Sequence, residues 1–122
     1  MSAAIVDIAT FSDADFARAF QWMINDVPFD FTGFELLMMV RRDPDDAEVM
    51  ISLSSVDDNG ILFQPDPDDG DKLTTFNIYI TRDQTKAMVA GDYVHSLLLL
   101  RPDGLREDIW RGTLTHAIGP TR

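Results

Sequence analysis

GDYVHSLLLLRPDGLREDIWRGTLTHAI, residues 91–118, is the stretch that decides the fold class. Tyr93–Leu100 is apolar on both of its alternating faces, which is typical of a central strand that is covered on both sides. Pro102-Asp103-Gly104 is a turn signal, because proline restricts φ and glycine permits a positive φ. Beyond the turn, apolar and polar side chains alternate along Arg106–Ile118, which indicates one buried face. The stretch therefore predicts two long antiparallel strands joined by a tight hairpin.

The same two-residue period recurs in three further segments, namely Phe34–Arg42, Glu48–Ser54 and Leu73–Thr81. Turn-forming Gly, Pro, Asn and Asp residues separate them, and frequent turns between strand-length segments predict an all-β sandwich or barrel. A second hairpin is expected at Asp58-Asn59-Gly60, because Asn-Gly suits a type I′ turn. This hairpin would join the second of the three segments to Ile61–Phe63.

The N-terminal third has two interpretations. Ser12–Asp15 are residues that can cap a helix, and Phe16, Phe20 and Met23 would share one face of it. As a strand, the same segment turns Phe16, Phe20 and Trp22 inward, and we take the strand as the prediction. Residues 82–88 predict one short helical turn that is capped by Thr81 or Asp83.

Length and composition bound the class of protein. The 122 residues suffice for one domain, 1–122, in which 1–10 could be a docking arm and 119–122 a tail. A hydrophobic content of 45% excludes wholesale disorder, and the absence of cysteine excludes disulfides and thiolate sites. The formal net charge of −11 argues against binding to nucleic acid or to anionic membranes. No signal peptide or membrane span is recognisable, so we expect a soluble chain that is made and kept in a cytoplasm.

Few residues point to catalysis or to a cofactor. The loop Pro65–Asp71 offers Asp66, Asp68, Asp69 and Asp71 as calcium ligands, but its spacing fails the EF-hand pattern. A calcium-binding or other ligand-binding module that uses this acidic loop is the alternative function. His95 and His116 lack the further ligands that a zinc site needs. With no nucleophile elbow and no phosphate-binding loop, the sequence predicts a protein that is not an enzyme and needs no cofactor.

The remaining candidates for function are apolar surfaces. Leu37 and Met39 occupy the second face of the strand 34–42, where they could meet a core of the domain itself or form a docking patch. In residues 3–8, Ala4, Ile5, Val6 and Ile8 make a short apolar segment that could add as a strand to a neighbour's sheet edge. If residues 93–100 and 106–118 pair around the hairpin with Leu99 opposite Arg106, His95 lies near Trp110 and far from His116.

A series of short motifs, in order over about residues 11–122, resembles small structural proteins of tailed bacteriophages, similar to the N-terminal domain of the upper baseplate protein of lactococcal phages. The motifs are Phe16–Trp22, Asp30-Phe31-Thr32-Gly33-Phe34-Glu35, Met50–Ser55 followed by Asn59-Gly60-Ile61, Leu73–Ile80, Thr85–Met88 followed by Ala90-Gly91-Asp92-Tyr93, and Trp110-Arg111-Gly112-Thr113-Leu114. Phe31 stands where that pattern usually has leucine.

The resemblance implies an immunoglobulin-like two-sheet antiparallel sandwich and a virion part of the tail, baseplate or head–tail region. Its partners would be other phage structural proteins and further copies of itself. The motif residues then have folding roles: Gly33 permits a sharp turn, Asn59 and Gly60 form the hairpin, and Gly91 precedes Tyr93 of a tyrosine corner. Gly112 would allow a close contact beneath a large side chain such as Trp110 or Tyr93.

Overall fold

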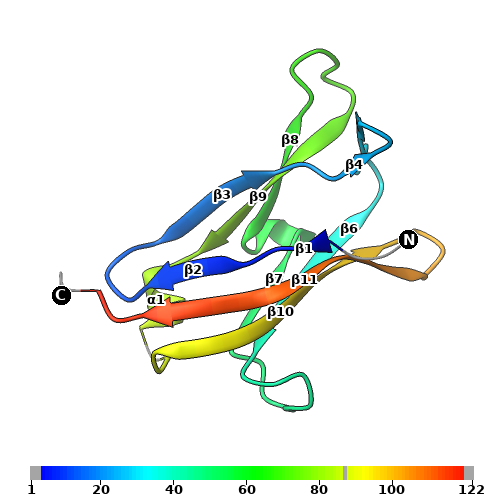
Figure 1. The fold of residues 1–122 in the computed structure, drawn as a ribbon. Helices are drawn as coiled ribbons and strands as arrows, with labels where there is room; N and C mark the ends of the chain where they lie inside the picture. The colour runs from blue at the N-terminus through cyan, green and yellow to red at the C-terminus, as the bar shows by residue number, and fades with distance from the viewer. Residues whose placement is uncertain (1–3, 87, 120–122) are drawn as a thin grey trace.

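The computed structural model describes residues 4–86 and 88–119, which fold into two packed sheets and a small hairpin (Figure 1). The strands of the larger sheet are β1 (Ala4–Ile5), β2 (Ile8–Phe11), β6 (Glu35–Arg41), β7 (Ile51–Ser54), β10 (Gly91–Leu100) and β11 (Arg106–Ala117). The smaller sheet contains β3 (Phe16–Phe20), β8 (Ile61–Pro65) and β9 (Leu73–Ile80). The remaining elements are β4 (Met23–Ile24), β5 (Val27–Pro28), the 3-10 helix η1 (Val56–Asp58) and α1 (Arg82–Thr85).

The core lies between the two sheets, as the two-residue period predicts. On β6, Leu36, Met38 and Val40 have no exposed surface. On β9, Phe76 and Ile78 are equally buried and face them from the other layer. Because each strand presents alternate side chains to one face, the apolar half of the pattern packs inside.

The order of the strands identifies the type of sandwich. The larger sheet runs β1-β11-β10-β6-β7, with β2 also on β11, and the smaller sheet runs β3-β9-β8. Immunoglobulin-like sandwiches place strands G, F and C in one sheet, with C′ added in the variable type, and B, E and D in the other. Read along this chain, β11, β10, β6 and β7 stand for G, F, C and C′, and β3, β9 and β8 stand for B, E and D. The predicted immunoglobulin-like all-β sandwich is confirmed.

The hairpin of β10 and β11 is confirmed, with two changes of register. Leu100 pairs with Arg106, and Leu99 pairs with Glu107 rather than with the arginine. A bulge between Leu97 and Leu98 moves the rest of β11 by one position, since a bulge opposes two residues to one. The difference at the turn and the bulge each move the register by one position, so His95 pairs with Gly112 instead of lying opposite Trp110.

The predicted hairpin at Asn59-Gly60 is wrong, although both strands that flank it exist. β7 pairs with β6 in the larger sheet, whereas β8 pairs with β9 in the smaller one. The segment between them passes from one layer to the other through η1, and only an isolated bridge joins Ser54 to Gly60. Gly60 has φ +88°, and a Cβ there would lie 2.4 Å from Cδ2 of the buried Leu53. Asn59 has φ −85°, so Asn59-Gly60 does not form the expected type I′ turn, and the segment is a crossing between sheets.

Residues 1–10 are predicted as a docking arm, but the described part of this segment, from Ala4 on, pairs with the last strand of the same chain. β1 and β2 both run parallel to β11, with Ala4 opposite Trp110 and Ile8 opposite Leu114. Ile8 is 3% exposed, because its alternating pattern supplies a buried face that the chain's own sheet covers. The prediction of a free docking arm is therefore wrong for these residues.

Gly112 makes this pairing possible. A Cβ at Gly112 would lie 1.7 Å from the carbonyl oxygen of Val6 and 3.2 Å from Nε2 of His95. The close contact predicted at this glycine exists, but with Val6 and His95 rather than beneath Trp110 or Tyr93. Trp110 is buried elsewhere in the core, with its ring centroid 4.7 Å from that of Phe20.

The other predicted folding roles are largely confirmed. β3 is a strand, with Phe16 and Phe20 half-buried and the residues between them exposed. Gly33 and Gly91 have φ of +83° and +143°. Tyr93 is buried and its hydroxyl donates to the carbonyl of Val89 at 2.7 Å, four residues upstream, as in a tyrosine corner.

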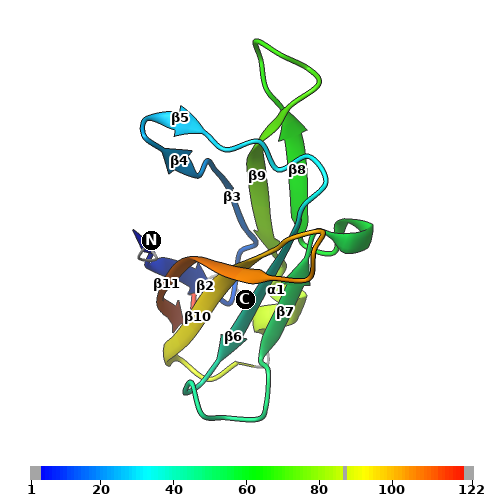
Figure 2. The ribbon, with the colours of Figure 1, turned by 90° about the vertical axis from the view of Figure 1, so that its right-hand side faces the viewer.

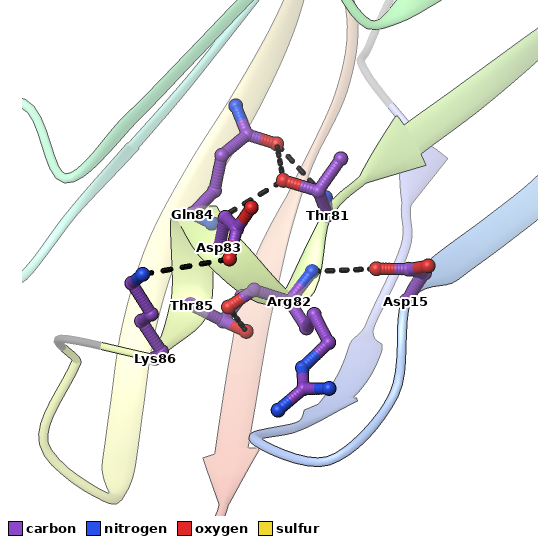
Figure 3. A network of polar contacts seen from close by, with 7 residues as sticks. All are labelled: Asp15, Thr81, Arg82, Asp83, Gln84, Thr85 and Lys86. Carbon is purple, nitrogen blue, oxygen red and sulfur yellow. Dashed lines mark hydrogen bonds and ion pairs between the residues drawn. The ribbon is translucent and has the colours of Figure 1, made fainter.

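The predicted helical turn is α1, and Figure 3 shows how its first turn is held. Thr81 is the N-cap: its side chain accepts from the amide of Gln84, whose side-chain oxygen accepts from the amide of Thr81 at 2.9 Å. This reciprocal pair is a capping box. The amide of Arg82 donates to Asp15 at 2.6 Å, which ties the turn to the loop before β3. Of the two expected caps, Thr81 is therefore confirmed.

The predicted tail begins later than expected. Gly119 is buried and its amide donates to Oγ of Ser12 at 3.0 Å, so this residue is part of the fold. Residues 120–122 of the tail and Ala3 of the arm lie outside the described residues.

Candidate docking surface

The outer face of the larger sheet carries the half-buried apolar side chains that the sequence singled out. Met39 on β6 pairs with Ser96 of β10 on one side and with Ser52 of β7 on the other. Leu37 pairs with Leu98 of β10. Both Leu37 and Met39 alternate with the core residues of β6, so they point away from the interior. Neither side chain belongs to the core cluster of the described residues, which favours the docking patch over a second core.

A hollow of about 480 Å³ opens on this face, and we call it the outer hollow. Its lining residues come mainly from β6, β10 and β11: Leu37, Met39, Arg41, Pro44, Val94, His95, Ser96, Leu98, Arg106, Arg111 and Gly112. The floor is largely apolar, with polar atoms from Ser96 and His95. In a chain with 21 acidic and 10 basic residues, no aspartate or glutamate of the described part lines the hollow, while three arginines do.

The three arginines are held to different degrees. Nη1 of Arg41 donates to the carbonyls of Asp46 and Ala47 at 2.7 and 3.0 Å, which draws the loop after β6 to the edge of the hollow. Arg111 pairs with Asp108 on its own strand. Arg106 is exposed and makes no ion pair or side-chain hydrogen bond with the residues that the structure describes. The hollow is thus cationic at its margin and has at least one guanidinium free for a partner.

Ile5 extends this face at the edge of the sheet. It is 75% exposed and pairs with Arg111 in the parallel ladder of β1 and β11. Of the other predicted interface residues of this segment, Ala4 is exposed, Val6 is half-buried and Ile8 is in the core. Of the predicted interface residues, Leu37, Met39 and Ile5 are therefore accessible on one face, whereas Ile8 is buried.

The acidic loop between β8 and β9 projects from the end of the smaller sheet (Figures 1 and 2). Its carboxylates hold the loop itself: Asp66 accepts from the amide of Asp68 at 2.7 Å and from the Thr74 hydroxyl at 3.1 Å. Asp69 accepts from the amide of Asp71 at 3.1 Å. The hydrogen bond from the Asp68 amide, above all, lowers the pKa of Asp66. These bonds use carboxylate oxygens that a calcium ion would need.

The arrangement of candidate metal ligands agrees with this description of the loop. Among residues 4–86 and 88–119, no three or more His, Cys, Asp or Glu side chains converge as a metal site would require. Asp68, Asp69 and Asp71 thus form an exposed acidic projection, and Asp66 is half-buried at its base, where it holds the Thr74 hydroxyl.

The two histidines lie on different strands, His95 on β10 and His116 on β11. His95 is 4% exposed and neither of its ring nitrogens has a partner at hydrogen-bond geometry among the described residues. Burial lowers the pKa of His95, and the nearby backbone of Val6 and Thr113 and the charge of Asp7 only partly oppose this. His116 is also buried, with Nδ1 2.9 Å from the hydroxyl of Thr10. Burial lowers its pKa too.

The sequence did not predict that Arg41, Arg106 and Arg111 line the same hollow. Arg41 and Arg111 were visible as outward positions of their strands, and Arg106 as the start of one. Nothing in the period of one strand tells which other strands lie beside it, so the three could not be brought to one place.

Comparison with known proteins gives little beyond this geometry. No protein-family model matches the chain, and no curated protein matches it. One similar solved structure is the PmoD soluble domain from Methylocystis sp. ATCC 49242 (Rockwell), with 14% identity over 91% of this chain and 77% of that one, and a TM-score of 0.46. Another is murine CRIg, with 10% identity over 93% of this chain and 92% of that one, and a TM-score of 0.37. Within the described ranges, neither helical segment has the length and apolar character that a membrane crossing requires.

Proposed function

We propose that this protein is a non-enzymatic structural subunit that assembles by docking copies of itself through the outer hollow. The observation that carries the proposal is the hollow itself, which has a volume of about 480 Å³, a largely apolar floor and three arginines in its lining. An open apolar concavity with a charged rim is the usual anatomy of a protein interface.

The setting we propose is the virion of a tailed phage, in the tail, baseplate or head–tail region. This part of the proposal is supported by the order of short motifs in the sequence. The strong negative charge fits such a role, because it keeps free subunits soluble and apart until complementary surfaces meet.

The docking surface can be tested by placing two charges on its floor. We expect the double substitution Leu37→Asp and Met39→Asp to abolish self-association, because two carboxylates would have to be desolvated in the interface. The measurement is the light-scattering mass as a function of protein concentration. Circular dichroism checks the fold, which we expect to persist because both side chains are only half-buried.

The matched control carries the same two charges elsewhere. Ala17 and Ala19 are exposed on β3 of the smaller sheet, so Ala17→Asp with Ala19→Asp should leave association unchanged. Unfolding of the Leu37/Met39 variant would mean that these residues belong to the core. Association that survives in a folded variant would contradict docking through this hollow.

A further inference from the structure

We propose that the occupant of the outer hollow is the acidic loop of a second copy, residues 66–71, so that copies join head to tail. This inference rests on the proposed function and adds the identity of the partner surface. It follows from three properties of the two surfaces: their charge, the stiffness of the loop and their positions on the molecule.

The charges of the two surfaces are complementary. Among the described residues that line the hollow, arginines alone are permanently charged, although acidic residues outnumber basic ones by 21 to 10 in the chain. The loop supplies exposed carboxylates at Asp68, Asp69 and Asp71. Arginine forms paired hydrogen bonds with carboxylates, and Arg106 has its guanidinium available for such a bond. The acidic loop of one copy thus meets the arginines of the next copy with charges of opposite sign.

The loop is shaped before it binds. The amide of Asp66 donates to the carbonyl of Lys72 at 2.9 Å, and the carboxylates of Asp66 and Asp69 hold the backbone between them. Pro65 and Pro67 restrict the backbone further and add apolar surface beside the carboxylates, which suits an apolar floor. A preorganised loop loses little conformational entropy on docking, so more of the contact energy remains as affinity.

The positions of the two surfaces make the contact one between copies. The loop projects beyond the end of the smaller sheet (Figures 1 and 2), whereas the hollow is lined from β6, β10 and β11 of the larger sheet. Donor and acceptor are therefore different patches, and an interface between different patches is heterologous. Such contacts repeat from copy to copy and build a ring or a filament, as a structural subunit requires.

The test mixes two variants, each of which keeps one half of the interface. In the hollow variant, Arg106→Glu and Arg111→Glu reverse the charge of two of the three arginines that line the hollow. In the loop variant, Asp68→Asn, Asp69→Asn and Asp71→Asn remove the charges, while asparagine keeps the oxygen that accepts from the Asp71 amide. The readout is the light-scattering mass of each variant alone and of an equimolar mixture.

We expect the wild-type mass to rise with concentration and to fall when salt screens the contact. Each variant alone should lose self-association and remain at the 13.7 kDa of one chain. The mixture should reach the mass of two chains and no more, because one intact loop meets one intact hollow and both free ends are blocked. Circular dichroism must show that both variants are folded.

Two controls carry the same change of charge away from the interface. Arg18→Glu with Arg82→Glu matches the hollow variant, and Asp26→Asn, Asp57→Asn and Asp58→Asn match the loop variant. All five residues are exposed, and the three aspartates have positive φ, which asparagine tolerates. Both controls should associate as the wild type does.

Other outcomes separate the inference from the proposed function. If the loop variant alone still associates while the Leu37→Asp, Met39→Asp variant does not, the hollow docks against something other than the loop; the inference then fails and the proposed function stands. A wild type that stays monomeric at every concentration contradicts both. A mixture that remains at the mass of one chain contradicts the head-to-tail contact.

Discussion

Gly112 is the residue on which the attachment of the N-terminal segment depends. The carbonyl of Val6 occupies the space where any other residue would place its Cβ. Since the obstacle is backbone and not the end of a flexible side chain, it cannot move without disturbing the pairing of β1 or β2 with β11.

We therefore expect Gly112→Ala to lower the free energy of unfolding by about 3 kcal/mol, the upper part of the range for overpacking. Urea unfolding at a fixed pH measures it. Gly70→Ala is the matched control, because a Cβ at Gly70 meets nothing within 4 Å, and its effect should stay within about 0.5 kcal/mol. Equal stability of the two variants would show that the approach of Val6 is not tight.

The buried histidines predict how stability depends on pH. Burial lowers the pKa of both His95 and His116 below the ordinary 6.5. On acidification the unfolded chain therefore takes up protons before the folded chain does. The contribution of the two histidines to the free energy of unfolding is constant well above pH 6.5 and falls as the pH drops below 6.5 toward the lowered pKa values.

Urea unfolding at about pH 7.5 and about pH 5.5 checks this expectation, since the two values bracket the ordinary pKa of histidine. The wild type should be less stable at the lower pH. The double variant His95→Gln, His116→Gln should lose most of that difference, whatever its absolute stability. A wild type that becomes more stable on acidification would contradict the neutral, buried state of the two rings.

At the scale of elements, the loop between β8 and β9 illustrates how aspartate carboxylates can stabilise the backbone of their own loop. Asp66 and Asp69 each accept a backbone amide two residues ahead, a hydrogen bond typical of Asx turns. Their oxygens stabilise the shape of the loop and do not converge on a common point.

We accordingly expect calcium to produce no saturable heat in calorimetry and no rise in melting temperature, at concentrations up to about 1 mM, where weak calcium modules bind. The variant Asp68→Asn, Asp69→Asn, Asp71→Asn is the comparison. A saturable heat in the wild type that this variant lacks would favour the alternative function, a calcium-binding module.

The segment between β7 and β8 shows why elements can be recognised while their pairing is misjudged. Val49–Ser54 and Ile61–Phe63 have the alternation of strands, and Asn59-Gly60 has the chemistry of a tight turn. Yet β7 and β8 pair with different partners in different layers. The same local signals fit a hairpin and a crossing between sheets, and only the neighbours β6 and β9 decide between them.

At the scale of the whole molecule, the outer hollow is a product of pairing between distant strands. Leu37, Val94 and Arg111 are far apart in the chain and line one hollow because β10 lies between β6 and β11. The excess of acidic residues is spread over the loops, whereas three of the ten basic residues meet at this place. The distribution of charge over the surface, rather than its sum, is what suits the molecule to docking.

The sequence by itself determined the elements. The alternation in β6, β9 and β11, the capping box at Thr81 and the turn at Pro102-Asp103-Gly104 are local, because each depends on side chains within a few residues of one another. From these follow the all-β class, the long hairpin and the identity of most core residues.

Only the tertiary structure decided which strands are neighbours and what their outer faces build together. The burial of residues 4–11 on β11 and the gathering of Leu37, Met39 and the arginines of the hollow were settled at that level. The physical reason is that the period of a strand states which face is apolar, while the partner that covers it is chosen by long-range packing and register.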